Sequence, residues 1–197
     1  MTFKLGLTGS IGMGKSTTAR IFAEEGCAVW DADAAVHRLY SAGGAAVAPM
    51  GALFPQAIVD GAVDRGALKG IISSDASALA QIEKIVHPLV AQDRQAFLDQ
   101  ATADVVVFDI PLLFEGSGAE MMDATVVVSA PAGVQRSRVM ERGTMTEAQF
   151  EHILSKQMPD AEKRARADYI VETTTLDAAR DQVRAILKDI RSRTAHA

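Results

Sequence analysis

Five short apolar runs, separated by stretches with helical spacing, constrain the fold more than any other feature of the chain. The runs lie at Phe3–Leu7, Cys27–Asp31, Asp104–Ile110, Ala124–Ala130 and Asp168–Glu172. Continuous Val and Ile runs that alternate with helices are typical of a parallel sheet, because such strands are covered by helices on both faces. The sequence therefore predicts an α/β fold with three layers built on a five-stranded parallel sheet.

Length and charge narrow the class of protein. With 197 residues, of which 48% are hydrophobic, residues 1–197 are most simply one domain with a substantial core. The net charge of -5 argues against broad binding to nucleic acid or to an anionic membrane. No window approaches the run of about 18 apolar residues that a membrane-spanning helix needs, and the start lacks a signal peptide. Cys27 is the only cysteine, which fits a reducing compartment. We expect a cytoplasmic protein, and of the oligomeric states a monomer is favoured.

A glycine-rich loop follows the first apolar run. The pattern G-x-x-x-x-G-K-[ST] is satisfied between the expected strand and an expected helix at 15–25, by Gly9, Ser10, Ile11, Gly12, Met13, Gly14, Lys15 and Ser16. Glycines let backbone N–H groups turn toward a phosphate, Lys15 bridges the β and γ phosphates, and the Ser16 hydroxyl ligates Mg²⁺. We expect this loop, with the adjoining Thr17, to bind a nucleoside triphosphate. An ordinary glycine-rich turn is the alternative.

The loop identifies a donor and leaves the reaction open. The chain contains no asparagine, so the Asn-Lys-x-Asp segment with which GTPases read guanine is missing. The Leu-Ser-Gly-Gly-Gln signature of transporter ATPases is missing as well. Phosphoryl transfer to a small acceptor is the favoured class. An ATP-dependent regulatory switch is the alternative from a different class.

Two carboxylates, Asp31 and Asp33, follow the second apolar run. Ligands of open α/β sheets bind at the carboxyl ends of the strands, where one carboxylate can accept a proton from an attacking hydroxyl or help to hold Mg²⁺. In an extended segment the two side chains would point in opposite directions, so that one faces the substrate and the other braces the loop. The alternative is that one of them, Asp33 included, caps the helix that follows.

About seventy residues separate the second and third runs, which is too many for a simple crossover. Helical patterns at 33–40, 65–72 and 76–100 indicate an inserted helical subregion, and the Ala/Gly-rich stretch at 41–52 is interpreted as a loop. Pro88 predicts a break or kink near His87. At the end of the chain, a helical stripe predicts packing on the sheet; it comprises Leu176, Ala179, Val183, Ile186, Leu187 and Ile190.

Several motifs together resemble one family over nearly the whole chain. They are GLTGSIGMGKST, DADAAVHRL, DGAVDRGALKGII, HPLV, DIPLLFE, RVMERG and ADYIVE, in the order and approximate spacing of dephospho-coenzyme A kinases. The resemblance implies phosphorylation of the 3′-hydroxyl of the ribose of dephospho-CoA by ATP and Mg²⁺, the completion of coenzyme A synthesis. It also implies a fold of the P-loop NTPase type, a helical acceptor-binding insert at 34–103 and a helical lid at 132–166.

The resemblance also implies roles for individual residues. Asp33 becomes the general base on the ribose hydroxyl, and Lys15 the phosphate clamp. Arg65, His87 and Leu113 fall on the acceptor side. The alternatives are a solvated surface arginine at Arg65 and a residue that only caps a helix break at His87.

Two arginines, Arg138 and Arg142, share a helix face in the expected lid and bind the nucleotide, with Arg142 over the γ-phosphate. Solvent exposure is the alternative for Arg138. At the third run, Asp109 is expected to help order Mg²⁺ through water. Glu115 is left open between a carboxylate of the site and a structural hydrogen-bond acceptor.

The segment at 171–175, Val-Glu-Thr-Thr-Thr, departs from the family, whose members commonly show Asp-Asn, a small residue and Gly near the adenine. Thr173 or Thr174 is expected to replace that hydrogen bond or to cap the final helix.

Overall fold

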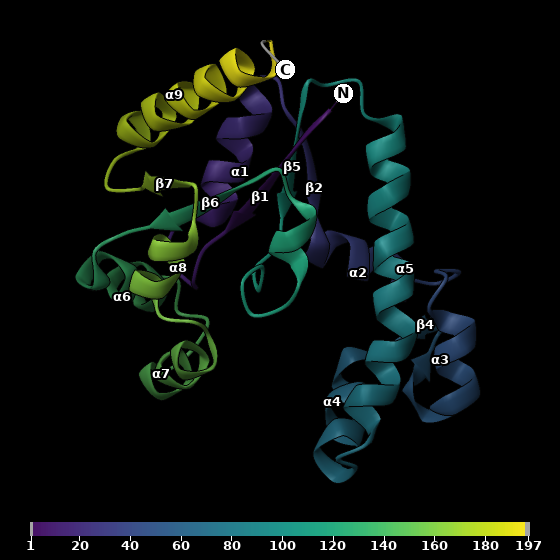
Figure 1. Ribbon diagram of the computed structural model, residues 1–197. Helices are drawn as coiled ribbons and strands as arrows, with labels where there is room; N and C mark the ends of the chain where they lie inside the picture. Colours follow the sequence, from purple (N-terminus) through teal and green to yellow (C-terminus); the bar gives the residue numbers. More distant parts are fainter. Residues whose placement is uncertain (1, 196–197) are drawn as a thin grey trace. The chain divides into compact units, whose positions relative to one another are not determined.

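The computed structural model describes residues 2–195, which form two compact units (Figure 1). The first unit comprises 1–30 and 101–197, and the second comprises 31–100. The second unit covers most of the span expected to form the helical insert. The elements of the first unit are β1 (Phe3–Thr8), α1 (Lys15–Glu24), β2 (Ala28–Asp31), β5 (Val105–Asp109), the 3₁₀ turn η2 (Gly118–Met121), β6 (Ala124–Ser129), α6 (Ala132–Glu141), α7 (Glu147–Lys156), α8 (Asp160–Arg166), β7 (Tyr169–Glu172) and α9 (Leu176–Thr194).

The five strands form one parallel sheet in the order β2-β5-β1-β6-β7. β1 is central and pairs with β5 on one side and β6 on the other. The register places Leu7 beside Asp109, so the carboxyl ends of β1 and β5 meet at the same edge of the sheet. Each strand coincides with one of the five apolar runs, which confirms the predicted parallel sheet and its α/β class.

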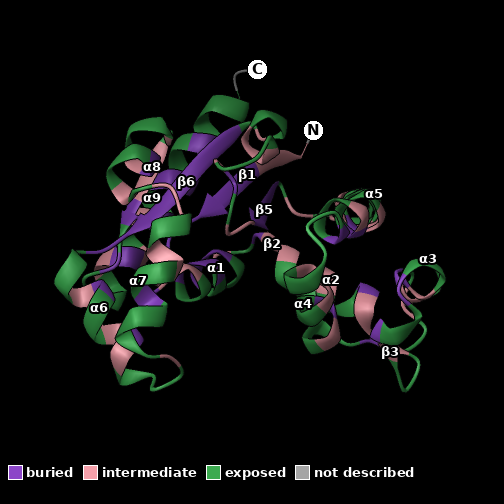
Figure 2. Cartoon of the chain, turned by 90° about the horizontal axis from the view of Figure 1, so that it is seen from below, coloured by how far each residue is buried: buried purple, intermediate pink, exposed green. Residues whose placement is uncertain are grey.

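The core of the first unit lies on the sheet and under two helices. Buried residues concentrate in β1, β5 and β6 (Figure 2), and α1 and α9 pack against each other. Five members of the predicted stripe on α9 are buried: Ala179, Val183, Ile186, Leu187 and Ile190. Leu176 is the exception, since it is 51% exposed. It is the first residue of α9, where the helix has no preceding turn to bring it down to the sheet.

The second unit has its own apolar core among short helices. Its elements are α2 (Ala32–Tyr40), α3 (Val47–Leu53), the 3₁₀ turn η1 (Pro55–Ala57), β3 (Ile58–Val59), β4 (Ala62–Val63), α4 (Arg65–Ser74) and α5 (Ala78–Gln100). Met50, Phe54, Ile82 and Val86 are buried in this core. β3 and β4 form an antiparallel hairpin, and its turn residues Asp60 and Gly61 have φ of 49° and 76°. Positive φ at both positions is what a two-residue hairpin turn requires.

In this unit, the expectations of a loop throughout 41–52 and of a helix break at Pro88 were wrong. The stretch at 41–52 is not a loop throughout, because Val47–Leu53 is helical. Pro49 stands in the first turn of α3, where its missing N–H has no helical partner to lose, and the turn buries Met50. Pro88 does not break α5, which runs through it from Ala78 to Gln100. Pro88 is exposed, so the carbonyl that lost its N–H partner one turn earlier is open to water.

Candidate active site

The glycines of the phosphate loop occupy positions that other residues would strain. Gly12 and Gly14 have φ of 78° and 94°, in the left-handed region that favours glycine. A Cβ atom built on Gly14 would lie 3.0 Å from the Thr173 hydroxyl, and one on Gly9 would lie 2.8 Å from the Val128 carbonyl oxygen. Gly14 is also the N-cap of α1, so the loop leads into a helix N-terminus. The local geometry is that of a phosphate cradle.

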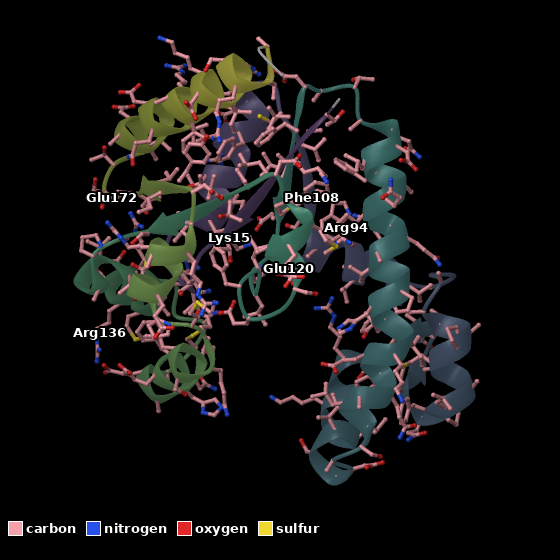
Figure 3. The ribbon with its side chains drawn as sticks, in the orientation of Figure 1. Lys15, Arg94, Phe108, Glu120, Arg136 and Glu172 are labelled. Carbon is pink, nitrogen blue, oxygen red and sulfur yellow. The ribbon has the colours of Figure 1, made fainter. Side chains whose placement is uncertain are left out.

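Lys15, the first residue of α1, lies where β1 and β5 end (Figure 3). Its ammonium contacts a carboxylate oxygen of Asp109, the last residue of β5. Asp109 is 3% exposed, so this charge pair sits at the edge of the core. The structure thereby brings together two candidate site residues that lie 94 positions apart and belong to separate sequence motifs. Ser16 follows Lys15 on the exposed first turn of the helix.

Thr173 connects the loop to α6. Its hydroxyl donates to the Met13 carbonyl oxygen at 2.6 Å and accepts from the Arg138 guanidinium at 2.9 Å. A second Arg138 nitrogen donates to the Thr173 carbonyl oxygen. The Thr173 N–H donates to the Ser129 carbonyl oxygen at 2.9 Å, at the end of β6. Arg138, which was selected as a nucleotide contact, is therefore held by Thr173.

The side chain that caps α9 is that of Thr175, whereas Thr173 or Thr174 was expected to cap this helix. The Thr175 hydroxyl accepts from the Ala178 N–H at 3.2 Å at the start of α9. The expectation of a cap at Thr173 was wrong, because its side chain is 7% exposed and turned to Met13. One sequence signal separates Thr175 from the other two threonines. Thr175 directly precedes Leu176, the first residue of the apolar stripe of the last helix.

A cavity of about 240 Å³ opens beside the loop. Its lining joins the start of α1, two arginines at the end of α6 and the start of α9: Gly14, Thr17, Arg138, Arg142, Thr173, Thr174, Thr175, Leu176 and Ala179. Arg142, the C-cap of α6, is exposed there. Two guanidinium groups beside an apolar floor suit the flat face and the polar edge of a heterocyclic base.

Glu115 has a structural role in this unit. It accepts from the Met158 N–H at 2.9 Å, and the Lys163 ammonium lies 3.0 Å from the same oxygen. Burial raises the pKa of the Glu115 carboxyl, but the Met158 and Lys163 contacts outweigh burial and leave that pKa below its ordinary value. Of the two interpretations left open from the sequence, the structure shows the hydrogen-bond acceptor.

The paired aspartates begin a helix, contrary to the expectation of an extended segment. Asp31 is the N-cap of α2 and accepts from the Ala34 N–H at 2.9 Å. Asp33 lies in the first helical turn and is exposed. The two side chains therefore do not alternate as on a strand. Because Asp31 satisfies the helix end, the Asp33 carboxylate is not needed as a cap.

The other acceptor candidates lie in different surroundings. In the second unit, the Arg65 guanidinium lies 5.7 Å from the centre of the Tyr40 ring, at the start of α4. Burial raises the pKa of Tyr40, and the nearby Arg65 charge partly offsets this. His87 is exposed on α5. In the first unit, Leu113 is fully buried and packs beneath Gly6, which favours a packing role.

Comparison with known proteins agrees with this geometry. A family model described as dephospho-CoA kinase matches residues 3–177. The chain belongs to the dephospho-CoA kinase family. The family resemblance found in the sequence motifs is thereby confirmed.

Individual members of the family and solved structures extend the match to the whole chain. A dephospho-CoA kinase from Ruegeria pomeroyi is 66% identical over 197 residues, which is 100% of both chains. A crystal structure from Thermus thermophilus superposes with a TM-score of 0.85 at 34% identity, covering 95% of this chain and 97% of the other. A dephospho-CoA kinase from Campylobacter jejuni has the same fold, with a TM-score of 0.64 at 21% identity and coverage of 96% and 97%.

Proposed function

We propose that this kinase divides its reaction between its two units, with the phosphate donor held by the first and the acceptor by the second. The reaction is that of its family: the γ-phosphoryl group of ATP is transferred to the 3′-hydroxyl of the ribose of dephospho-CoA, the last step of coenzyme A synthesis. The observation that carries the proposal is the phosphate loop, with Lys15 beside Asp109, in a chain that matches the family from 3 to 177.

On the donor side, the loop residues Gly9–Thr17 bind the triphosphate through backbone N–H groups and the positive end of α1. Lys15 exchanges its contact with Asp109 for the β and γ phosphates when ATP binds. The base occupies the cavity beside Arg138 and Arg142. Arg142 neutralises charge that develops on the transferred group, while the lid at 132–166 excludes water that would otherwise hydrolyse ATP.

On the acceptor side, Asp33 takes the proton from the ribose hydroxyl as that oxygen attacks phosphorus. Its support is the free, exposed carboxylate on the first turn of α2, whose helix cap is supplied by Asp31. Arg65 and His87 bind the acceptor, with the Arg65 guanidinium steadied on the Tyr40 ring for a diphosphate. Leu113 supports the acceptor side by packing. Residues 34–103 constitute the acceptor-binding insert.

Magnesium fits the oxygen groups near Lys15. Among residues 2–195, no group of three or more His, Cys, Asp or Glu side chains is arranged to hold a metal ion. Mg²⁺ does not need such a cage, because it is commonly bound by one or two protein oxygens together with substrate phosphates and water. Ser16 and Asp109 would hold it, and when bound it would offset the negative charge of the phosphates.

We further propose that the protein acts as a monomer in the cytoplasm and needs neither a nucleic acid nor a membrane partner. The net charge of -5 supports the absence of a nucleic acid partner. Across residues 2–195, none of the helices combines the length and apolar character needed to cross a bilayer. Light scattering coupled to gel filtration checks the proposed state, and a dimer mass would overturn it.

A panel of acceptors tests the division of roles. The purified protein is incubated with ATP, Mg²⁺ and either dephospho-CoA, a nucleoside or a small hydroxy acid, and product is followed by mass. We expect turnover of dephospho-CoA that stops with excess chelator. Brisk turnover of a nucleoside without turnover of dephospho-CoA would contradict the proposed acceptor side.

A further inference from the structure

Two paired charges in the first unit have no part in the mechanism above: the buried ammonium of Lys163 and the partly exposed carboxylate of Glu115. Lys163, on α8, is 0% exposed, and its ammonium lies 3.0 Å from a Glu115 carboxylate oxygen. Apart from this ion pair, the ammonium makes no hydrogen bond within the described part of the chain. A buried charge is costly unless it is paired, so the Lys163 ammonium depends on the Glu115 carboxylate.

Glu115 stands on a segment that is fixed to the sheet. The segment begins where β5 ends at Asp109 and passes through Pro111, whose carbonyl oxygen accepts from the Thr8 hydroxyl at 2.9 Å. Leu113, two residues before Glu115, is 0% exposed. The Glu115 carboxylate is therefore carried by the same rigid stretch that positions Asp109 beside Lys15.

The Glu115 carboxylate holds the stretch at which the lid returns to the sheet, residues 157–163, which we name the lid root. Its oxygen accepts from the Met158 N–H at 2.9 Å, between α7 and α8. Two more bonds fix the lid root. The Gln157 side chain accepts from the Ile11 N–H of the phosphate loop at 3.2 Å, and the Asp160 carboxylate accepts from the Ser129 hydroxyl at 2.7 Å.

α6 is held by Val139, which is 1% exposed, and by the Gln135 amide, which donates to the Ile11 carbonyl oxygen at 2.7 Å. α7 has fewer attachments: it is mostly exposed, Phe150 is its one buried residue, and it follows a turn in which Gly143 has φ of 62°. Arg136 joins α6 to α7 through exposed contacts with Glu147 and Glu151 (Figure 3). Exposed ion pairs contribute little to stability. The position of α7 is therefore set by Phe150 and by its two ends, and the lid root is the end that carries the buried Lys163.

We infer that Glu115 and Lys163 are positioning residues that seat the lid root beside the phosphate loop. Their pairing fixes Met158 and, through its neighbour Gln157, the contact with Ile11. A lid seated in this way directs the phosphoryl group to the acceptor and away from water. The inference rests on the lid function proposed above, since it requires that residues 132–166 cover the nucleotide.

The test is the double variant E115Q/K163M, assayed for transfer to dephospho-CoA and for acceptor-independent ATP hydrolysis in the same sample. Gln keeps an oxygen for the Met158 N–H, and Met fills the space of the lysine stem, so the variant removes both charges and leaves no charge stranded. We expect the ratio of hydrolysis to transfer to rise about tenfold, because a displacement of about 1 Å can cost transfer up to about 100-fold.

The ratio separates positioning from a loss of folded protein, since a smaller active fraction lowers both rates equally. A matched control is D104N/R191M, which removes an exposed ion pair between the sheet and α9, with a nitrogen to oxygen distance of 2.6 Å. We expect this control to keep the wild-type ratio. A folded E115Q/K163M protein with the wild-type ratio overturns the inference.

Two single variants complete the design. K163M leaves Glu115 bound to the Met158 N–H, with 19% of its side chain exposed to water, so it is expected to fold and to raise the ratio in its own right. If the double variant does not fold, K163M alone tests the positioning role. An unchanged ratio of hydrolysis to transfer in folded K163M overturns the inference. R142A tests the lid itself: if R142A raises the ratio and the Glu115 and Lys163 variants do not, the lid function stands and the inference fails.

Discussion

The phosphate loop and the helices of the second unit, which we propose bind the acceptor, hold their charged side chains in different ways. In the first unit, Lys15 contacts the buried Asp109, and Arg138 is bound by Thr173 through two hydrogen bonds. In the second unit, Asp33 and His87 are exposed on helix surfaces, and exposed Arg65 rests on a tyrosine ring.

Because of this difference, removing a charged side chain should change the free energy of unfolding in the first unit more than in the second. Charged groups that are already bonded to the protein cannot be removed without leaving a partner unsatisfied, which destabilises the fold. Exposed groups can be removed without such a penalty. Substitutions around the loop should therefore reduce both stability and activity, whereas substitutions on the acceptor helices should reduce activity alone.

The largest effect is expected from Lys15→Ala. Removing the ammonium deletes a phosphate contact and leaves Asp109, 3% exposed, without that cation. We expect single-turnover transfer to fall about 1,000-fold, in the range found for a lost electrostatic contact to a transition state. ATP affinity and the unfolding temperature should fall as well. Unchanged single-turnover rates would remove Lys15 from the mechanism and break the comparison on the donor side.

Asp33→Asn should come next, with transfer reduced about 100-fold as the general base is lost. Because Asp33 is exposed and does not cap α2, the unfolding temperature and the ATP affinity should stay at wild-type values. The matched control is Asp31→Asn, since asparagine also caps a helix and should leave turnover unchanged. Near-normal turnover of the Asp33 variant would show that the acceptor helix carries no base there.

Thr173→Val should have a mixed effect. Valine keeps the shape of the side chain but removes the hydroxyl that binds Met13 and Arg138, so the free energy of unfolding should fall by about 1–3 kcal/mol. The Michaelis constant for ATP should rise with it, since Arg138 loses a bond that holds it at the cavity. Denaturant titration measures the first quantity, and Thr173→Ser, which keeps the hydroxyl, is the control. A valine variant as stable as the wild type would contradict the link between loop and lid.

Arg65→Ala should have the smallest effect on transfer, and it should change the free energy of unfolding by no more than about 0.5 kcal/mol, because the side chain is exposed. We expect a higher Michaelis constant for dephospho-CoA and an unchanged one for ATP. Tyr40→Phe keeps the ring that Arg65 rests on and should keep both constants. A change in the Michaelis constant for ATP instead would place Arg65 on the donor side and would contradict the proposed division of roles between the units.

Local sequence patterns were sufficient for the sheet and for the loop. Each strand is a continuous apolar run, and the loop requires glycine at positions such as Gly14, whose backbone is left-handed. The Asp31 cap and the α3 helix were harder, because short segments near Pro49 and Ala32 are decided by one or two hydrogen bonds and by tertiary packing.

Contacts between distant segments could not be predicted from spacing. Thr173 is 160 residues from Met13, and Met158 is 43 residues from Glu115. Nothing in either local pattern specifies the partner, so Glu115 stayed open between two roles until its neighbours were known. The same limit applies to Lys163, whose helix of seven residues gives no sign that one lysine is buried.

The bond between Thr173 and Met13 also has a consequence for how the chain is made. The phosphate loop leaves the ribosome well before Thr173, one of the residues that fixes its shape. At about 10 residues per second, a separation of 160 residues corresponds to a delay of about 16 s. During this interval the nascent loop lacks the Thr173 contact, which forms only after the later segment has been synthesised and has folded back onto the loop.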